Sequence, residues 1–137
     1  MLFRSPDLLL PRSQEIEKLM EPGNSIRPFG PVFFDFDKFN LSSEERVKVI
    51  EVAAFLQENR TARLLIEGYC DWKGTPAYNK SLGERRAHAI KEYLIELGAD
   101  PRRIDTLSLG DEAADPLAPD ARMRLDRKAE FVIAKGE

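Results

Sequence analysis

Residues 68–87 read GYCDWKGTPAYNKSLGERRA, and they mark a change from strand to helix. The short apolar run at 64–66 just before them has the length of a buried strand. Thr75 can accept hydrogen bonds from a first helical turn, and Pro76 suits the first helical position because its missing N–H is not needed there. Asp71 is therefore predicted to lie just past the carboxyl end of a strand, where open sheets usually receive ligands.

A long helix is predicted after this turn. Its predicted buried stripe consists of Ala87, Ile90, Leu94 and Leu97. Gly98 and Pro101 are expected to end the helix by a left-handed cap and a breaker. Arg86 lies four residues after Leu82 and four before Ile90, so it is predicted to point toward the covered side of the helix.

Strands and helices alternate in the rest of the chain. Ser42 and Glu45 form a capping-box pattern, which predicts a helix over about 43–58. Its predicted buried residues are Val49, Ile50, Ala53 and Leu56. Alternating apolar residues predict a first strand with Val32, Phe34 and Phe36 on one side, and further strands at 104–109 and 128–133. One sheet with helices packed against it follows, so the fold class is α+β or α/β.

Length and composition limit the possible functions. With 137 residues the chain fits one domain, predicted at 29–137, after an N-terminal arm or linker at 1–28. A net charge of -3 disfavours nucleic acid as a partner, and no apolar run approaches the roughly 20 residues of a membrane helix. Cys70 and His88 are the single cysteine and histidine, too few for a disulfide or a zinc site. No cofactor and no direct membrane insertion by this chain are expected.

Asp71 and Arg86 together suggest a receptor for a zwitterion. A carboxylate can accept an ammonium group, and a guanidinium can hold a carboxylate through two parallel N–H bonds. Each residue also has a purely structural interpretation: Asp71 could stabilise the turn, and Arg86 could pack its stem while its charge reaches water. If they form a binding site, replacing either one by Ala should abolish binding and leave thermal unfolding nearly unchanged.

The same stretch resembles the OmpA-like peptidoglycan-binding domain. The matching segments are CD at 70–71, GT at 74–75, YN at 78–79 and LGERRA at 82–87. FDFDKF at 34–39 is similar to the family's first-strand motif, and DRKAE at 126–130 to its last-strand motif. The resemblance covers about residues 31–134 and is closest to the branch of peptidoglycan-associated lipoproteins.

This resemblance implies a single α+β domain with a β-α-β-α-β-β core, a mixed sheet and two long helices. It implies non-covalent binding of peptidoglycan through the meso-diaminopimelate of the stem peptide, with no catalytic residue and no enzyme activity. The ligand-binding residues carried over are Asp71, Arg86, Asp37, Phe39, Thr75, Asn79, Leu82 and Arg127. A periplasmic protein is expected, attached to the outer membrane through an anchor that is missing from this chain or separate from it.

Three residues depart from the family pattern. Tyr69 stands where the family usually has His, and it is expected to reshape the pocket wall. Asp126 replaces an Asn and is expected to compete for Arg127, and Lys128 replaces a second arginine.

Other functions were weighed against peptidoglycan binding. A phosphate loop lacks the required Gly-Lys-Ser/Thr spacing, the pair Asp35 and Asp37 is common on a solvated strand face, and His88 has no nucleophile placed beside it. The remaining alternative is a protein-interaction scaffold of the cell envelope with a degenerate ligand site. Trp72, Lys73 and the acidic loop at 111–120 would form its surface, with other envelope proteins as partners.

Overall fold

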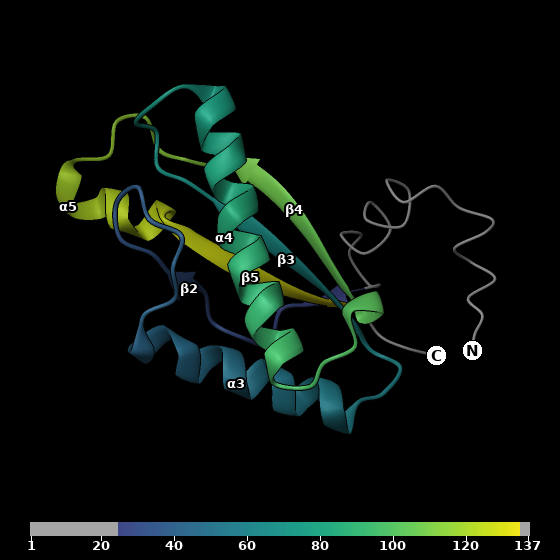
Figure 1. The fold of residues 1–137 in the computed structure, drawn as a ribbon. Helices are drawn as coiled ribbons and strands as arrows, with labels where there is room; N and C mark the ends of the chain where they lie inside the picture. The colour runs from purple at the N-terminus through teal and green to yellow at the C-terminus, as the bar shows by residue number, and fades with distance from the viewer. Residues whose placement is uncertain (1–24, 135–137) are drawn as a thin grey trace, which may run out of the picture.

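A computed structural model describes residues 25–134 of the chain. In chain order, the elements are β1 (Ser25–Ile26), β2 (Val32–Phe33), α3 (Ser43–Glu58), β3 (Arg63–Tyr69), α4 (Pro76–Glu96), η1 (Pro101–Arg103), β4 (Ile104–Gly110), α5 (Asp120–Met123), η2 (Arg124–Asp126) and β5 (Lys128–Ala134). Figure 1 shows α4 lying across the sheet and α3 crossing below it. The series from β2 to β5 confirms the predicted β-α-β-α-β-β core.

The sheet is mixed, with the order β1-β5-β3-β4. β3 runs parallel to β4 and antiparallel to β5, so β3 is covered on both edges. β1 and β2 both pair with β5, β1 at Ile133 and Ala134 and β2 at Lys128 and Ala129. The start of β5 therefore lies beside β2 and close to the end of β3, where the predicted binding residues gather.

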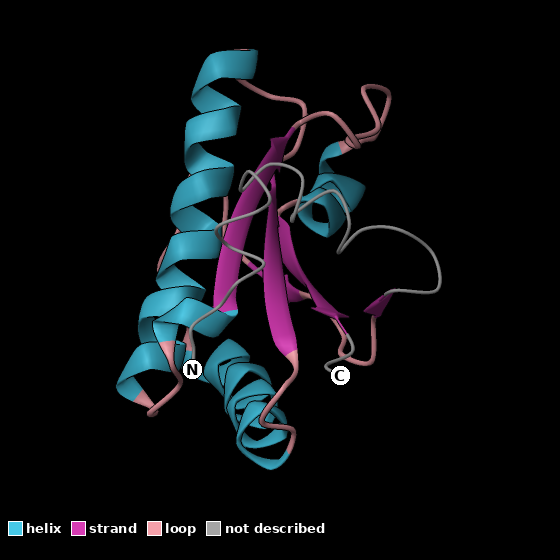
Figure 2. Cartoon of the chain, turned by 90° about the vertical axis from the view of Figure 1, so that its right-hand side faces the viewer, coloured by secondary structure: helices cyan, strands magenta, loops and turns pink. Residues whose placement is uncertain are grey.

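One face of the sheet carries the main core. Figure 2 shows the two long helices packed on this side. The core joins the following buried residues from α3, α4 and the strands: Val49, Val52, Leu56, Ala87, Ile90, Leu94, Leu64, Ile66, Ile104, Ala129, Phe131 and Ile133. Successive strand residues point to opposite faces, so Leu65 and Val132 belong to a second, smaller cluster.

Two glycines set the distance between α4 and the sheet. A Cβ atom on Gly68 of β3 would lie 1.9 Å from the carbonyl oxygen of Gly83, and one on Gly83 would lie 2.4 Å from Ser108 Oγ. Backbone meets backbone here, with no room for a side chain on either residue. This close approach places the following turn of α4, which carries Arg86, against the end of β3.

The first predicted strand is shorter than its alternating pattern suggests. Val32 and Phe34 are buried as predicted, but Phe36 is 55% exposed. The chain turns after Phe34, because Lys38 donates its backbone N–H to Asp35 and Asp37 adopts a left-handed φ of 58°. The alternation of a strand cannot continue through such a turn.

Both long helices begin and end close to the predicted positions, but their buried faces differ in detail. Ile50 and Leu97 were predicted to be buried and are exposed, while Val52 is buried. The capping box is also incomplete. Ser42 accepts the N–H of Glu45, but the Glu45 carboxylate accepts the N–H of Phe33 and thereby fixes α3 to β2.

The predicted N-terminal arm lies mostly outside the described residues. Its last part, residues 25–28, includes β1, which the sequence pattern did not predict. Arg27 just after β1 donates to Glu67 at 2.8 Å and to Glu130 at 3.1 Å. Within residues 25–134, no helix combines the length and apolar character that crossing a membrane requires.

Replacing Gly83 by Ala should destabilise the domain, although Ala favours a helix by about 1 kcal/mol over Gly. The added Cβ would press on Ser108 and on the Gly68 carbonyl, and overpacking of this kind costs about 1–3 kcal/mol net. Urea unfolding measures the difference. The matched control is Gly30→Ala, because Gly30 has open space around it. A Gly83→Ala protein as stable as the control would contradict the close contact.

Candidate functional site

A small pocket opens where β3, the 35–38 turn and the start of α4 meet. Its volume is about 70 Å³. The residues that line it are Phe36, Asp37, Cys70, Asp71, Lys73, Gly74, Tyr78, Asn79, Leu82 and Arg86. One water molecule takes about 30 Å³ in the liquid, so the pocket suits a small head group and not a whole peptide. Its walls carry charges of both signs.

Asp71 presents a buried carboxylate with one unused oxygen. Oδ1 accepts the backbone N–H of Lys73 at 3.0 Å, the Asx-type bond that also shapes the turn. Oδ2 is buried without a hydrogen bond from the described residues. Arg127 Nη1 lies 3.5 Å from Oδ2, close enough for electrostatic attraction and long for a hydrogen bond. Because an unsatisfied buried oxygen is costly, Oδ2 is a natural acceptor for a ligand.

Arg86 is almost fully buried, with 1% of its surface exposed. Nε donates to the carbonyl of Lys38 at 2.8 Å, Nη1 to that of Tyr69 at 2.9 Å, and Nη2 to that of Asp35 at 3.1 Å. Nη1 also meets the Cys70 sulfur at 3.6 Å. The guanidinium lies 5.2 Å from the centre of the Phe34 ring, and burial lowers the pKa of Arg86.

These contacts change the predicted role of Arg86. A guanidinium has five N–H groups, and four of them have partners among the described residues. One N–H on Nη2 is left for a ligand, so the expected grip by two parallel bonds is not available in this arrangement. Arg86 offers the pocket a fixed positive charge and a single donor.

The other predicted residues divide into two groups. Asp37, Asn79 and Leu82 line the pocket with Asp71 and Arg86, and Asp37 accepts a hydrogen bond from the Tyr78 hydroxyl. Phe39, Thr75 and Arg127 do not line it. Thr75 caps α4 by accepting the N–H of Tyr78 at 3.1 Å, and Phe39 packs 5.6 Å below the guanidinium of Arg85 on the outside of α4.

Pocket residues outside the predicted set are mostly the neighbours of predicted ones. Phe36, Lys73 and Tyr78 are examples. Tyr78 lies seven residues after Asp71 and one before Asn79, but no spacing rule shows that its hydroxyl reaches back to Asp37. A larger hollow of about 410 Å³ lies between the end of α3 and residues 97–103, and none of the predicted site residues lines it.

The three departures from the family pattern lie away from the pocket wall. The Tyr69 side chain points to the sheet face opposite α4, where its hydroxyl bonds Glu67 at 3.3 Å and Lys128 lies 5.1 Å from its ring centre. The expectation that Tyr69 reshapes the pocket wall is therefore wrong. Asp126 Oδ2 accepts the N–H of Asp115, and no ion pair with Arg127 is found among the described residues.

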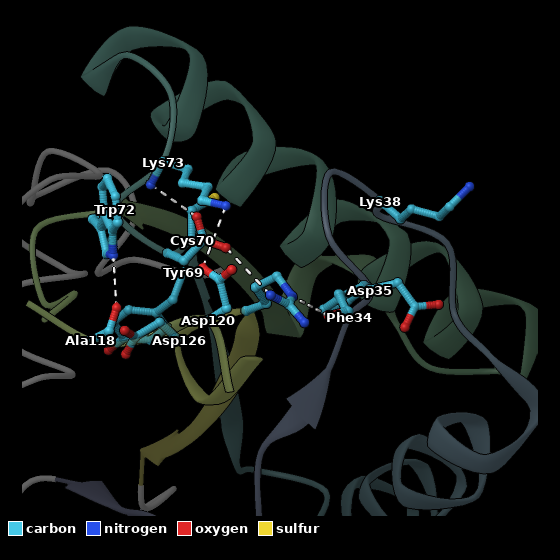
Figure 3. Close-up of polar contacts among 12 residues, drawn as sticks. Phe34, Asp35, Lys38, Tyr69, Cys70, Trp72, Lys73, Ala118, Asp120 and Asp126 are labelled. Carbon is cyan, nitrogen blue, oxygen red and sulfur yellow. Dashed lines mark hydrogen bonds and ion pairs between the residues drawn. The ribbon is translucent and has the colours of Figure 1, made fainter. Parts of the chain in front are cut away.

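Trp72 and Lys73 connect the turn after β3 to the segment around the start of α5. The indole N–H of Trp72 is directed toward the carbonyl of Ala118 at 3.4 Å, and Lys73 Nζ lies 3.6 Å from Asp120 (Figure 3). Trp72 remains 39% exposed. Trp72 is absent from the pocket lining, so its indole forms a separate surface beside the site.

Replacing Arg86 by Ala should destabilise the fold, in contrast to the expectation from the sequence. The change removes three hydrogen bonds from a charged donor, of which the bond to Tyr69 is buried and those to Lys38 and Asp35 are partly buried, and such a bond contributes about 1.5–3 kcal/mol. We expect the thermal midpoint to fall by roughly 10 °C or more. Arg85→Ala is the control, because Arg85 is the exposed neighbour on the same helix. Equal melting of the two variants would show that the three bonds do not hold the fold.

The buried Cys70 thiol should make the domain less stable at high pH. The thiol is buried and donates to the carbonyl of Asn79 at 3.1 Å, and burial raises its pKa to about 11. In the unfolded chain the thiol has a pKa of about 8.5. The buried thiol therefore contributes its full stabilisation of the fold below that pH, and this stabilisation is lost as the pH rises toward 11. Between pH 8 and pH 10.5, the free energy of unfolding measured with urea should fall more for the wild type than for Cys70→Ala. Parallel losses in the two proteins would contradict this.

The similarity of this chain to known proteins covers the part that forms the fold and the pocket. A model of the OmpA family matches residues 33–127. The peptidoglycan-associated lipoprotein of Haemophilus influenzae is 40% identical over 93 residues, 67% of this chain and 60% of that protein. Outer membrane protein A of Bordetella avium is 42% identical over 78 residues, 57% of this chain and 40% of that protein. The chain thus spans about 60% or less of the length of these relatives.

Solved structures of similar proteins have the same fold. The crystal structure of the peptidoglycan-associated lipoprotein from Burkholderia pseudomallei matches with a TM-score of 0.70 and 31% identity, over 79% of this chain and 90% of that one. This confirms the predicted α+β fold. The relatives are named as lipoproteins and an outer membrane protein, which supports the prediction that the chain is not an enzyme. The family match covers more than half of the sequence, and the chain therefore belongs to the OmpA family.

Proposed function

We propose that this domain binds peptidoglycan non-covalently by holding the free head group of a stem-peptide meso-diaminopimelate in the pocket between Asp71 and Arg86. The ammonium group bonds Asp71 Oδ2, and the carboxylate faces the guanidinium of Arg86. The names of the relatives support the choice of polymer. The observation that carries the proposal is the buried Oδ2 of Asp71: it lacks a hydrogen bond from the described residues, and Asp71 lines a pocket of head-group size.

The same observation argues against a scaffold whose ligand site has decayed. A decayed site has no need to keep a buried carboxylate with an open oxygen beside a buried guanidinium, because such groups are costly without a partner. The exposed ring of Trp72 could still receive a partner protein, since it lies outside the pocket.

A single pocket of this size gives modest affinity. One charge-assisted hydrogen bond contributes about 1.5–3 kcal/mol, and the pocket accommodates few of them. Peptidoglycan repeats its stem peptide many times, so several domains on one envelope surface gain effective concentration. We propose that the domain works in the periplasm and tethers the outer membrane, or an assembly attached to it, to the cell wall.

Asp71→Asn tests the site with little disturbance of the turn, because the amide oxygen can still accept the N–H of Lys73. The full chain is sedimented with purified sacculi, and binding should weaken by about tenfold or more because the ammonium loses its charged acceptor. Free meso-diaminopimelate should compete with the wild type. The control is Glu51→Gln, the same chemical change at an exposed position on α3. Wild-type sedimentation of Asp71→Asn would refute this site.

A further inference from the structure

The sheet face opposite α4 carries a small apolar cluster. It consists of Leu65, Val132 and Ala134, with Leu107 packed against it. Leu65 and Val132 are register partners on β3 and β5, and both are 0% exposed. The two long helices pack on the other face of the sheet (Figure 2). Within residues 25–134, every apolar residue of this cluster belongs to a strand, so no second layer covers it.

Complete burial on a sheet face requires such a layer, because strand neighbours cover only the flanks of a side chain. Glu67 on the same face is buried beneath Arg27, which donates to its carboxylate at 2.8 Å. Arg63 does not cover Leu65 and Val132 in this way, because its guanidinium extends to Asp105 on β4, on the side of Leu65 away from β5. The zero exposure of the pair therefore indicates an apolar layer from outside residues 25–134.

The first described residue of the chain lies at the edge of the cluster. Ser25 pairs with Ala134, which is itself a member of the cluster. The two segments outside the described residues, 1–24 and 135–137, therefore both join the rest of the chain beside it. The longer one could span about 80 Å if fully extended, several times the length of a seven-residue strand such as β3.

The composition of these two segments decides between them. Residues 135–137 read KGE and have no apolar side chain. Residues 1–24 contain three consecutive leucines at 8–10 and, at the spacing of one helical face, Ile16, Leu19 and Met20. Such side chains gain free energy when they leave water. Only the N-terminal segment can therefore supply an apolar layer to the cluster.

We propose that residues 1–24 form the missing layer of this domain and pack apolar side chains on Leu65 and Val132, on the sheet face opposite α4. The folded domain then begins before residue 29, where the sequence pattern placed its start. The pocket lies at the carboxyl end of β3 on the side of α4, so the packed segment leaves it open. This inference does not depend on the proposed function.

Methyl-labelled full chain tests the contact directly. In nuclear Overhauser spectra, the methyl groups of Leu65 and Val132 should give cross-peaks to methyl groups of residues 1–24. A sample mixed from two differently labelled preparations shows whether both partners belong to one chain. Cross-peaks that arise only between chains would assign the cover to a second copy and overturn the proposal, and so would the absence of any cross-peak to residues 1–24.

Two full-chain variants test the energetic contribution of the segment. One combines Leu8→Ser, Leu9→Ser and Leu10→Ser, and the other combines Ile16→Ser, Leu19→Ser and Met20→Ser. At least one of them should lower the thermal midpoint by about 4 °C or more, because apolar side chains lose their buried contacts.

Leu117→Ser is the control, since Leu117 is 88% exposed and its change should leave the midpoint nearly unaltered. In a Val132→Ala background, the loss caused by the segment variant should be smaller, because part of the contact is already absent. Two segment variants that melt like the control would overturn the proposal. A loss that Val132→Ala leaves unchanged would place the segment elsewhere on the domain and overturn it as well.

Discussion

The guanidinium of Arg86 is the interaction on which the site depends. It joins three segments that are far apart in the sequence: the 35–38 turn, the end of β3 and the third turn of α4. The 35–38 turn contributes two backbone carbonyls, the end of β3 contributes one, and α4 contributes the buried cation that donates to them. The pocket walls are these same segments. The binding site therefore exists only in the complete fold, and the residue that carries the positive charge is also the residue that assembles the walls.

Arg86 can reach these carbonyls because Gly68 and Gly83 allow α4 to touch β3. Arg86 follows Gly83 by three residues, so it lies on the same side of the helix one turn later. A side chain at either glycine would push the helix away from the sheet and lengthen the bonds to Tyr69 and Asp35. The contact between these two glycines thus fixes the position of the long buried side chain of Arg86. Stability and binding geometry have a common cause here.

The sequence predicted the two long helices and the four strands β2 to β5 because local signals determine them, and Asp71 and Arg86 both line the pocket as the family resemblance implies. Thr75 and Pro76 start α4, a short apolar run identifies β3, and the alternation of Ala129, Phe131 and Ile133 with their neighbours identifies β5. The missed features depend on tertiary contacts. Phe36 was predicted on the buried side of a strand, but the chain turns at Asp37. β1 is only two residues long and forms because the edge of β5 is available for pairing. The sequence also could not predict that most N–H groups of Arg86 are occupied, because their partners are mainly backbone carbonyls, which every residue carries.

The two ends of the pocket are consequently unequal. Asp71 has an oxygen with no hydrogen bond from the described residues, so in the proposed complex an ammonium group would gain a directional bond there. Arg86 has nearly all of its donors committed to the fold, so in the proposed complex it would face a carboxylate mainly as a charge. Charge without direction discriminates poorly between ligands, so the geometry of a ligand is selected mainly at the Asp71 end of the pocket.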